Sequence, residues 1–168
     1  VMELLTPNID EDVLMLISLM DHTPGQRQFT DTDKFRTYFK KGWSDDEYSE
    51  IEERLLVTQA ECAARHRRQI VEMCHSRNIP IASHDDTTPE HIEQAVEEEI
   101  AISEFPTTQT AAALAREAGI YIIMGGPNVV RGGSHSGNVA ASDLAQAGLL
   151  DILSSDYVPG SLVSGAFT

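Results

Sequence analysis

The chain has 168 residues, 41% of them hydrophobic, which suits one folded domain with an apolar core and argues against a disordered segment. Twelve basic and 27 acidic residues give a formal net charge of −15 at pH 7, which argues against nonspecific binding to nucleic acid or to an anionic membrane. No apolar run approaches the roughly 20 residues of a membrane-spanning helix. Cys62 and Cys74 fall in one predicted helix, too far apart to form a disulfide. We therefore expect free thiols, cytoplasmic localisation, and neither nucleic acid nor membrane as a partner.

The first half of the chain is predicted to contain one strand and two helical segments. Residues 13–20 form a continuous apolar run, typical of a strand that is buried on both faces. Residues 29–48 mix aromatic and charged side chains, which we interpret as a helical insertion or lid within a single domain of residues 1–168. Apolar residues then recur at helical spacing from about 46 to 77, and Asn78 provides a stop.

Three further helices are predicted in the second half. The first opens with Thr88 as its cap and Pro89 as its first residue. The second covers 107–118 and is closed by Gly119, and the third is a short helix capped by Ser142. The buried face of the first of these helices is expected to consist of Ile92, Ala95, Val96 and Ile100.

Short apolar runs alternate with these helices. Strict alternation of strands and helices predicts an α/β fold with a parallel sheet and right-handed crossovers. About five parallel strands fit either an open doubly wound sheet or a segment of an eight-stranded barrel. Besides the run at 13–20, the strands are expected at 79–83, 101–103, 120–124 and 151–154.

Reactive side chains follow three of the predicted strands directly. (β/α) barrels build their active sites at the carboxyl ends of strands. We interpret His84 as a metal ligand, with the two aspartates after it as its partners or as a general base, although those aspartates could instead cap the next helix. Asp156 is a candidate metal ligand and activator of a bound water, or alternatively a helix cap. Glu104 is a candidate ligand, or alternatively a carboxylate that favours the dipole of the following helix.

The glycine-rich segment 125–138 predicts a loop that binds phosphate. Glycines let backbone N–H groups converge on anionic oxygens, and polar side chains add donors. The segment lacks the pattern of a P-loop, and a plain flexible connection is the alternative. The candidate substrate-binding side chains in it are Asn128, Arg131, Ser134, His135 and Asn138.

Further candidates follow the first strand. His22 is a candidate metal ligand and Arg27 a candidate phosphate-binding residue. The alternative is a Pro-Gly turn with incidental polar side chains. We interpret the three remaining histidines as solvent-facing residues on helix surfaces, namely His66, His75 and His91.

The strings MDHTPGQRQF, ASHDDTT, SEFPTT, GGPNVVRGGSHSGN and DILSSDYVP together resemble the PhnM family, hydrolases of the carbon–phosphorus lyase pathway in the amidohydrolase superfamily. The resemblance implies a (β/α)8 TIM-type barrel with one or two divalent metal ions, which the sequence leaves open as Zn, Mn, Fe or Ni. It also implies release of diphosphate from α-D-ribose 1-methylphosphonate 5-triphosphate, a phosphorylated small molecule. His84 matches a mid-barrel histidine of the superfamily, and Asp156 matches the aspartate of its last strand.

Two features depart from that pattern. The superfamily's His-x-His motif occurs nowhere in the sequence, and Glu104 stands where many relatives have histidine. We therefore expect the chain to be the C-terminal-side part of a barrel, nearly inactive by itself, weak in metal binding and homo-oligomeric through open strand edges. The alternatives are a hydrolase of the same superfamily that acts on a C–N bond, and a noncatalytic domain.

Overall fold

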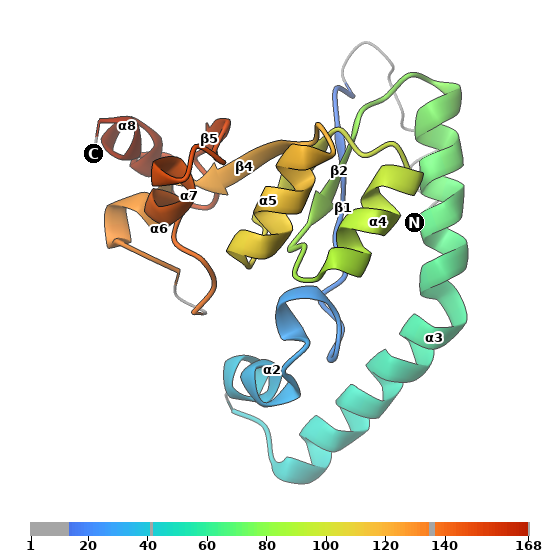
Figure 1. The fold of residues 1–168 in the computed structure, drawn as a ribbon. Coiled ribbons are helices and arrows are strands. Elements are labelled where there is room, and N and C mark those ends of the chain that lie inside the picture. The colour runs from blue at the N-terminus through green and yellow to red at the C-terminus, as the bar shows by residue number, and fades with distance from the viewer. Residues whose placement is uncertain (1–13, 41, 135–136, 168) are drawn as a thin grey trace. The chain divides into compact units, whose positions relative to one another are not determined.

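The computed structural model describes residues 14–40, 42–134 and 137–167, and the chain divides into two compact units. The first unit is Val1–Pro80 and the second is Ile81–Thr168. In Figure 1 the first unit runs from blue to green and the second from green to red.

The first unit is mainly helical among its described residues. It contains strand β1 (Ile17–Leu19), the 3-10 helix η2 (Arg27–Phe29), helix α2 (Thr32–Phe39) and helix α3 (Asp45–Ser76). The segment that we interpreted as a helical insertion therefore forms η2, α2 and the start of α3, while its role as a lid stays a prediction. A buried aromatic cluster holds these elements together, with ring contacts between Phe29, Phe35 and Tyr48.

The prediction of a strand over 13–20 was too long. Only the three residues of β1 are extended within the described part of that run, and Met15 and Met20 are 74% and 58% exposed. The strand ends early because the chain turns after Met20, where the Asp21 carboxylate accepts a hydrogen bond of 3.0 Å from the backbone N–H of Thr23. Residue 13 lies outside the described residues.

The long helix was predicted correctly. Helix α3 starts at a capping box, in which Ser44 and Glu47 each bond to the backbone of the other. It ends at Ser76, and Asn78 then adopts a left-handed conformation with a φ of 55°, as a helix stop requires. Among the described residues, no helix is both long and apolar enough to cross a membrane.

The second unit is a parallel sheet with helices between its strands. Strands β2 (Ile81–His84), β3 (Ile102–Glu104), β4 (Tyr121–Gly125) and β5 (Ile152–Ser154) each pair in parallel with the next strand along the chain. A doubly wound sheet reverses its strand order at a switch point, and these four strands show no reversal. The arrangement is therefore that of a segment of an α/β barrel, as expected.

Five helices follow the strands of this unit among its described residues. Alanines of α4 and α5 are fully buried, so their small side chains let both helices lie close to the sheet (Figure 1). The helices are α4 (Pro89–Glu97), α5 (Gln109–Glu117), α6 (Gly126–Arg131), α7 (Ala141–Gln146) and α8 (Ser161–Ala166).

Two details of the predicted helices were wrong. Val96 is 52% exposed, because the buried face of α4 is already formed by Ile92 and Ala95. Ser142 lies inside α7 and does not cap it. Instead, the side-chain oxygen of Asn128 accepts a hydrogen bond of 2.9 Å from the N–H of Ala141, the first residue of α7.

Candidate active site

The candidate residues of the second unit lie at one end of the sheet. His84 and Glu104 are the last residues of β2 and β3, and they face each other in the register of the two strands. Gly125 and Ser154 end β4 and β5 and are paired in the same way, and Asp156 follows two residues later. Because the strands are parallel, all these positions lie at their carboxyl ends.

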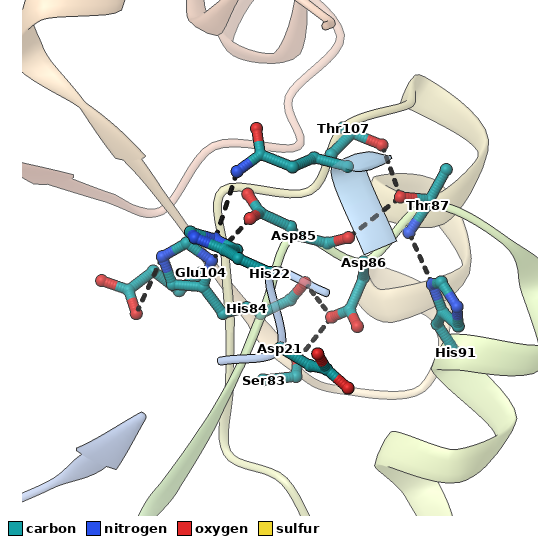
Figure 2. A network of polar contacts seen from close by, with 12 residues as sticks. Asp21, His22, Ser83, His84, Asp85, Asp86, Thr87, His91, Glu104 and Thr107 are labelled. Carbon is teal, nitrogen blue, oxygen red and sulfur yellow. Dashed lines mark hydrogen bonds and ion pairs between the residues drawn. The ribbon is translucent and has the colours of Figure 1, made fainter. Parts of the chain in front are cut away.

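The His84 ring lies between two carboxylates, as Figure 2 shows. Its Nδ1 is 2.9 Å from Oδ2 of Asp85, and its Nε2 is 3.9 Å from Oε2 of Glu104. Burial alone would lower the pKa of the ring. The contact with Asp85 and the charges of Glu104 and Asp86 outweigh burial and hold the pKa of His84 above its ordinary value.

The loops that follow β2 and β3 have the same local form. The residue after each strand, Asp85 or Phe105, adopts a left-handed conformation with a φ of 57° or 55°. The N–H of Asp85 donates to the carbonyl of Glu104 at 2.8 Å, which fixes the first loop against the neighbouring strand. This turn brings the Asp85 carboxylate back onto the His84 ring.

These donors suit a divalent metal ion. A metal-bound histidine usually donates its second ring N–H to a carboxylate, and Asp85 stands at Nδ1 in that position. A proton held on Nδ1 leaves the Nε2 lone pair directed at the side of the ring where Glu104 lies. Mixed imidazole and carboxylate ligands fit several first-row metals, so this donor set does not select one of them.

Asp156 depends on the glycine that ends β4. Asp156 has a φ of 48°, and a Cβ atom built on Gly125 would lie only 3.0 Å from its Oδ2. A side chain at position 125 would therefore require the Asp156 carboxylate to shift by a few tenths of an ångström. Gly125 thus leaves room for the carboxylate in its present position.

The glycine-rich segment is not the open loop that we predicted. Residues 126–131 form helix α6, since Pro127 suits a first helical turn and Gly132, with a φ of 79°, ends the helix. At its end, Nη2 of Arg131 donates to the Tyr157 hydroxyl at 3.2 Å. The Asn128 amide bonds to the backbone of Val139 and to that of Ala141.

The three remaining candidates of this segment follow α6 in the chain. Ser134 and Asn138 are half-buried in the connection between α6 and α7. His135 lies outside the described residues. Their predicted contact with phosphate stays a prediction.

His22 and Arg27 belong to the first unit. Gln28 Nε2 lies 3.1 Å from Nε2 of His22, whose ring meets the edge of Phe29 at a centroid distance of 5.6 Å. Arg27 is only 5% exposed and has a φ of 48°. The roles that we assigned to both at the active site stay predictions.

Comparison with curated proteins found a relative of this chain. Over 161 residues, which are 95% of the chain, the sequence is 48% identical to an alpha-D-ribose 1-methylphosphonate 5-triphosphate diphosphatase of Escherichia coli (strain K12). The chain is similar to a known diphosphatase. It spans 43% of the length of that relative. The resemblance that the sequence motifs indicated is thereby confirmed.

The other two comparisons add no relative. No protein-family model matches the chain, and no solved structure matches it. The arrangement of the strand ends therefore rests on the present structure.

Two features of this region were not predicted from the sequence. His91 is not a plain surface residue, because its Nδ1 accepts hydrogen bonds from the N–H groups of Thr87 and Thr88 at the start of α4. The second feature is the burial of Asp86, which is 0% exposed. One sequence pattern could have indicated that these two loops are related. A serine and two threonines recur at an interval of 20 residues, in Ser83–Thr88 and Ser103–Thr108.

Proposed function

We propose that the protein is a metal-dependent hydrolase that releases diphosphate from a ribose 5-triphosphate of the 1-methylphosphonate type. One observation carries the proposal: 95% of the chain aligns, at 48% identity, with a protein named for that activity. The polar residues at the strand ends support it, since a histidine and carboxylates at the carboxyl ends of parallel strands are the usual parts of such a site.

In the proposed mechanism, Nε2 of His84 and the carboxylates of Glu104 and Asp156 would hold the metal ion. A divalent metal at this site would supply Lewis acidity and lower the pKa of water. Asp85 orients the His84 ring through Nδ1. Asp156 would accept the proton of the attacking water as the water oxygen bonds to the α-phosphorus. The bond from that phosphorus to the oxygen that bridges it to the β-phosphorus would break, so that diphosphate leaves and the 5-phosphate remains. We propose Zn, Mn, Fe or Ni as the metal, and His22 of the first unit as a further ligand.

Arg131 is the proposed main phosphate-binding residue. A guanidinium matches the geometry of phosphate oxygens. The Arg131 guanidinium donates a hydrogen bond to the hydroxyl of Tyr157, the residue that follows Asp156. A local cation matters here because the chain as a whole is acidic and repels a triphosphate. The further proposed substrate contacts are Asn128, Ser134, His135, Asn138 and Arg27.

The setting of the enzyme follows from its proposed substrate. We propose that the protein acts in the cytoplasm on a phosphorylated small molecule, without a nucleic-acid or membrane partner, and that it forms homo-oligomers. Sedimentation of the purified chain at several concentrations tests the last point.

A chimera tests the proposed function. The 161 aligned residues of this chain replace their counterpart in the Escherichia coli relative, and diphosphate release from the triphosphate is measured with excess Mn²⁺ or Zn²⁺. We expect activity within about tenfold of that of the relative, a loss of at most ~1.4 kcal/mol in the barrier. His84→Ala or Asp156→Asn in the chimera should abolish release. A folded chimera that binds metal but releases no diphosphate would contradict the proposal.

A further inference from the structure

Behind the strand ends, one buried carboxylate joins two strands. Oδ2 of Asp86 accepts hydrogen bonds from the hydroxyls of Ser83 on β2 and of Ser103 on β3, the latter at 2.7 Å (Figure 2). All three residues are 0% exposed. We call this group the serine–aspartate bridge. From the sequence, Asp86 was expected only as a partner of His84, a general base or a helix cap, and its bonds to Ser83 and Ser103 were not predicted.

The register of the strands relates this bridge to the candidate site. Ser83 and Ser103 face each other in the parallel pairing, and so do the next residues, His84 and Glu104. Successive side chains of a strand point to opposite faces of the sheet. The bridge therefore joins β2 and β3 on one face, one residue before the two side chains that project from the other.

The backbone reinforces the same connection. The carbonyl of Asp86 accepts a hydrogen bond of 2.8 Å from the N–H of Thr107, which lies in the loop after β3. The hydroxyl of Thr107 donates to that of Thr87 at 2.8 Å. Asp86 is thus bonded to β3 through its side chain and to the loop after β3 through its main chain, and the two loops are joined by these bonds.

The distance between the two candidate ligand atoms makes the bonding of β2 to β3 important for metal binding. Nε2 of His84 and Oε2 of Glu104 lie 3.9 Å apart. Two metal–ligand bonds of roughly 2.0 to 2.2 Å each span at most about 4.4 Å, so the two atoms can share an ion only within narrow limits. A slip of β2 against β3 by a fraction of an ångström is enough to exceed them.

We propose that Asp86 is a positioning residue for His84 and Glu104, and that it acts by fixing β2 against β3 through Ser83 and Ser103. Its consequence for metal binding rests on the function proposed above. Loss of the carboxylate would also leave two buried hydroxyls without their acceptor. Because an unsatisfied buried donor is costly, the strands would then shift to satisfy these hydroxyls.

Asp86→Ala, which removes the acceptor of both serine hydroxyls, tests the proposal, and Asp151→Ala is its matched control. Asp151 is also a carboxylate between two strands, since its Oδ2 accepts the N–H of Ile122 at 2.8 Å and its Oδ1 lies 2.8 Å from Nη2 of Arg116. It precedes β5, at the amino end of the sheet. Both variants remove one negative charge, and urea unfolding of each identifies conditions in which both are fully folded.

The first readout is Zn²⁺ affinity of the purified chain, measured by competition with a chelating dye. We expect Asp86→Ala to weaken binding at least tenfold and Asp151→Ala to change it less than twofold. The double variant Ser83→Ala/Ser103→Ala keeps the Asp86 carboxylate and should weaken binding as Asp86→Ala does. Normal affinity in the double variant would show that Asp86 acts by charge alone, which would overturn the proposal. If Asp86→Ala does not fold, Ser103→Ala should still weaken binding about threefold, and unchanged affinity there counts against the proposal.

The second readout needs no metal. In the metal-free chain, proton–proton contacts in the nuclear Overhauser spectrum report whether the His84 ring stays beside the Glu104 side chain. We expect these contacts in the wild type and in Asp151→Ala, and their loss in Asp86→Ala. If the folded chimera releases no diphosphate but this pattern holds, the proposed function fails and the positioning role stands. If Asp86→Ala keeps the contacts, the positioning role fails whether or not the chain binds metal.

Discussion

The two carboxylates on either side of His84 differ in their access to solvent. The Asp85 side chain is 5% exposed, whereas that of Glu104 is 24% exposed. A carboxylate excluded from water keeps one partner and orients it, while a more accessible one can exchange its partner for a ligand. At the scale of single residues, Asp85 therefore fixes the ring, and Glu104 is the more accessible of the two carboxylates, as its proposed role as a ligand requires.

Arg131→Ala should raise the KM of the chimera for the triphosphate about tenfold, a change of ~1.4 kcal/mol, with kcat within about threefold. The reason is that Arg131 would bind the phosphate in the ground state and in the transition state alike. Steady-state kinetics measure both constants. Arg68→Ala, which removes an exposed charge from α3, is the control and should leave KM unchanged. An unaltered KM in Arg131→Ala would exclude this residue from phosphate binding.

The raised pKa of Tyr48 predicts a loss of stability at alkaline pH. Burial, with help from a hydrogen bond of 3.1 Å to Glu52, raises the pKa of Tyr48 from 10.0 to about 12. The neutral phenol is favoured in the folded state, so its contribution is complete below pH 10 and is lost as the pH rises toward 12. Urea unfolding at pH 9 and at pH 11 should show a smaller drop in the free energy of unfolding for Tyr48→Phe than for the wild type.

The control for this effect is Tyr121→Phe, which removes a tyrosine that is 58% exposed. That variant should follow the wild type between the two pH values. An equal drop in all three proteins would assign the alkaline loss to other groups.

At the scale of elements, the strands and the longer helices were predictable and the short connections were not. The strands of the second unit followed from apolar runs. Helix α3 followed from helical spacing and its stop at Asn78, and α4 from the cap at Thr88 and Pro89 after it. Helix α6 was missed because glycine favours loops, whereas here Pro127 lies in the first turn of a helix and Gly132 ends it.

The candidate site was predictable for the same reason as the strands. Parallel strands bring their carboxyl ends together, so His84, Glu104 and Asp156 could be assigned to one end from the sequence. The serine–aspartate bridge could not, because Ser103 lies 17 residues from Asp86 and the bond depends on strand register. The contact of Gly125 with Asp156 likewise exists only in three dimensions.

Ser44→Ala tests the start of helix α3. The substitution removes a side chain that accepts from Glu47 N–H and donates to the Glu47 carboxylate, so we expect a loss of about 1 kcal/mol in the free energy of unfolding. Chemical denaturation measures it. Ser49→Ala makes the same change at an exposed position inside the helix and should be neutral or slightly stabilising. Equal effects of the two substitutions would show that the cap contributes nothing.

At the scale of the whole molecule, the net charge of −15 should make stability depend on salt. Repulsion among surface carboxylates opposes the compact state, and the Debye length falls from about 30 Å at 0.01 M to about 8 Å at 0.15 M. We expect the Tm to rise over that range of NaCl, as measured by calorimetry. In the double variant Glu53→Lys/Glu117→Lys each reversal adds two positive units, and the rise should be smaller. A Tm that falls with salt would indicate that attractive ion pairs dominate.

The equivalence of the loops after β2 and β3 has a consequence for how such a site can change. Ser83–Thr88 and Ser103–Thr108 place a serine, a candidate ligand, a left-handed residue and a helix cap in the same sequence positions. The two loops thus share one backbone pattern, and the residue in the second position can differ between them. Histidine occupies that position on β2 and glutamate on β3, so in the proposed site a change of one codon would alter the ligand chemistry of either strand while the surrounding backbone stays as it is.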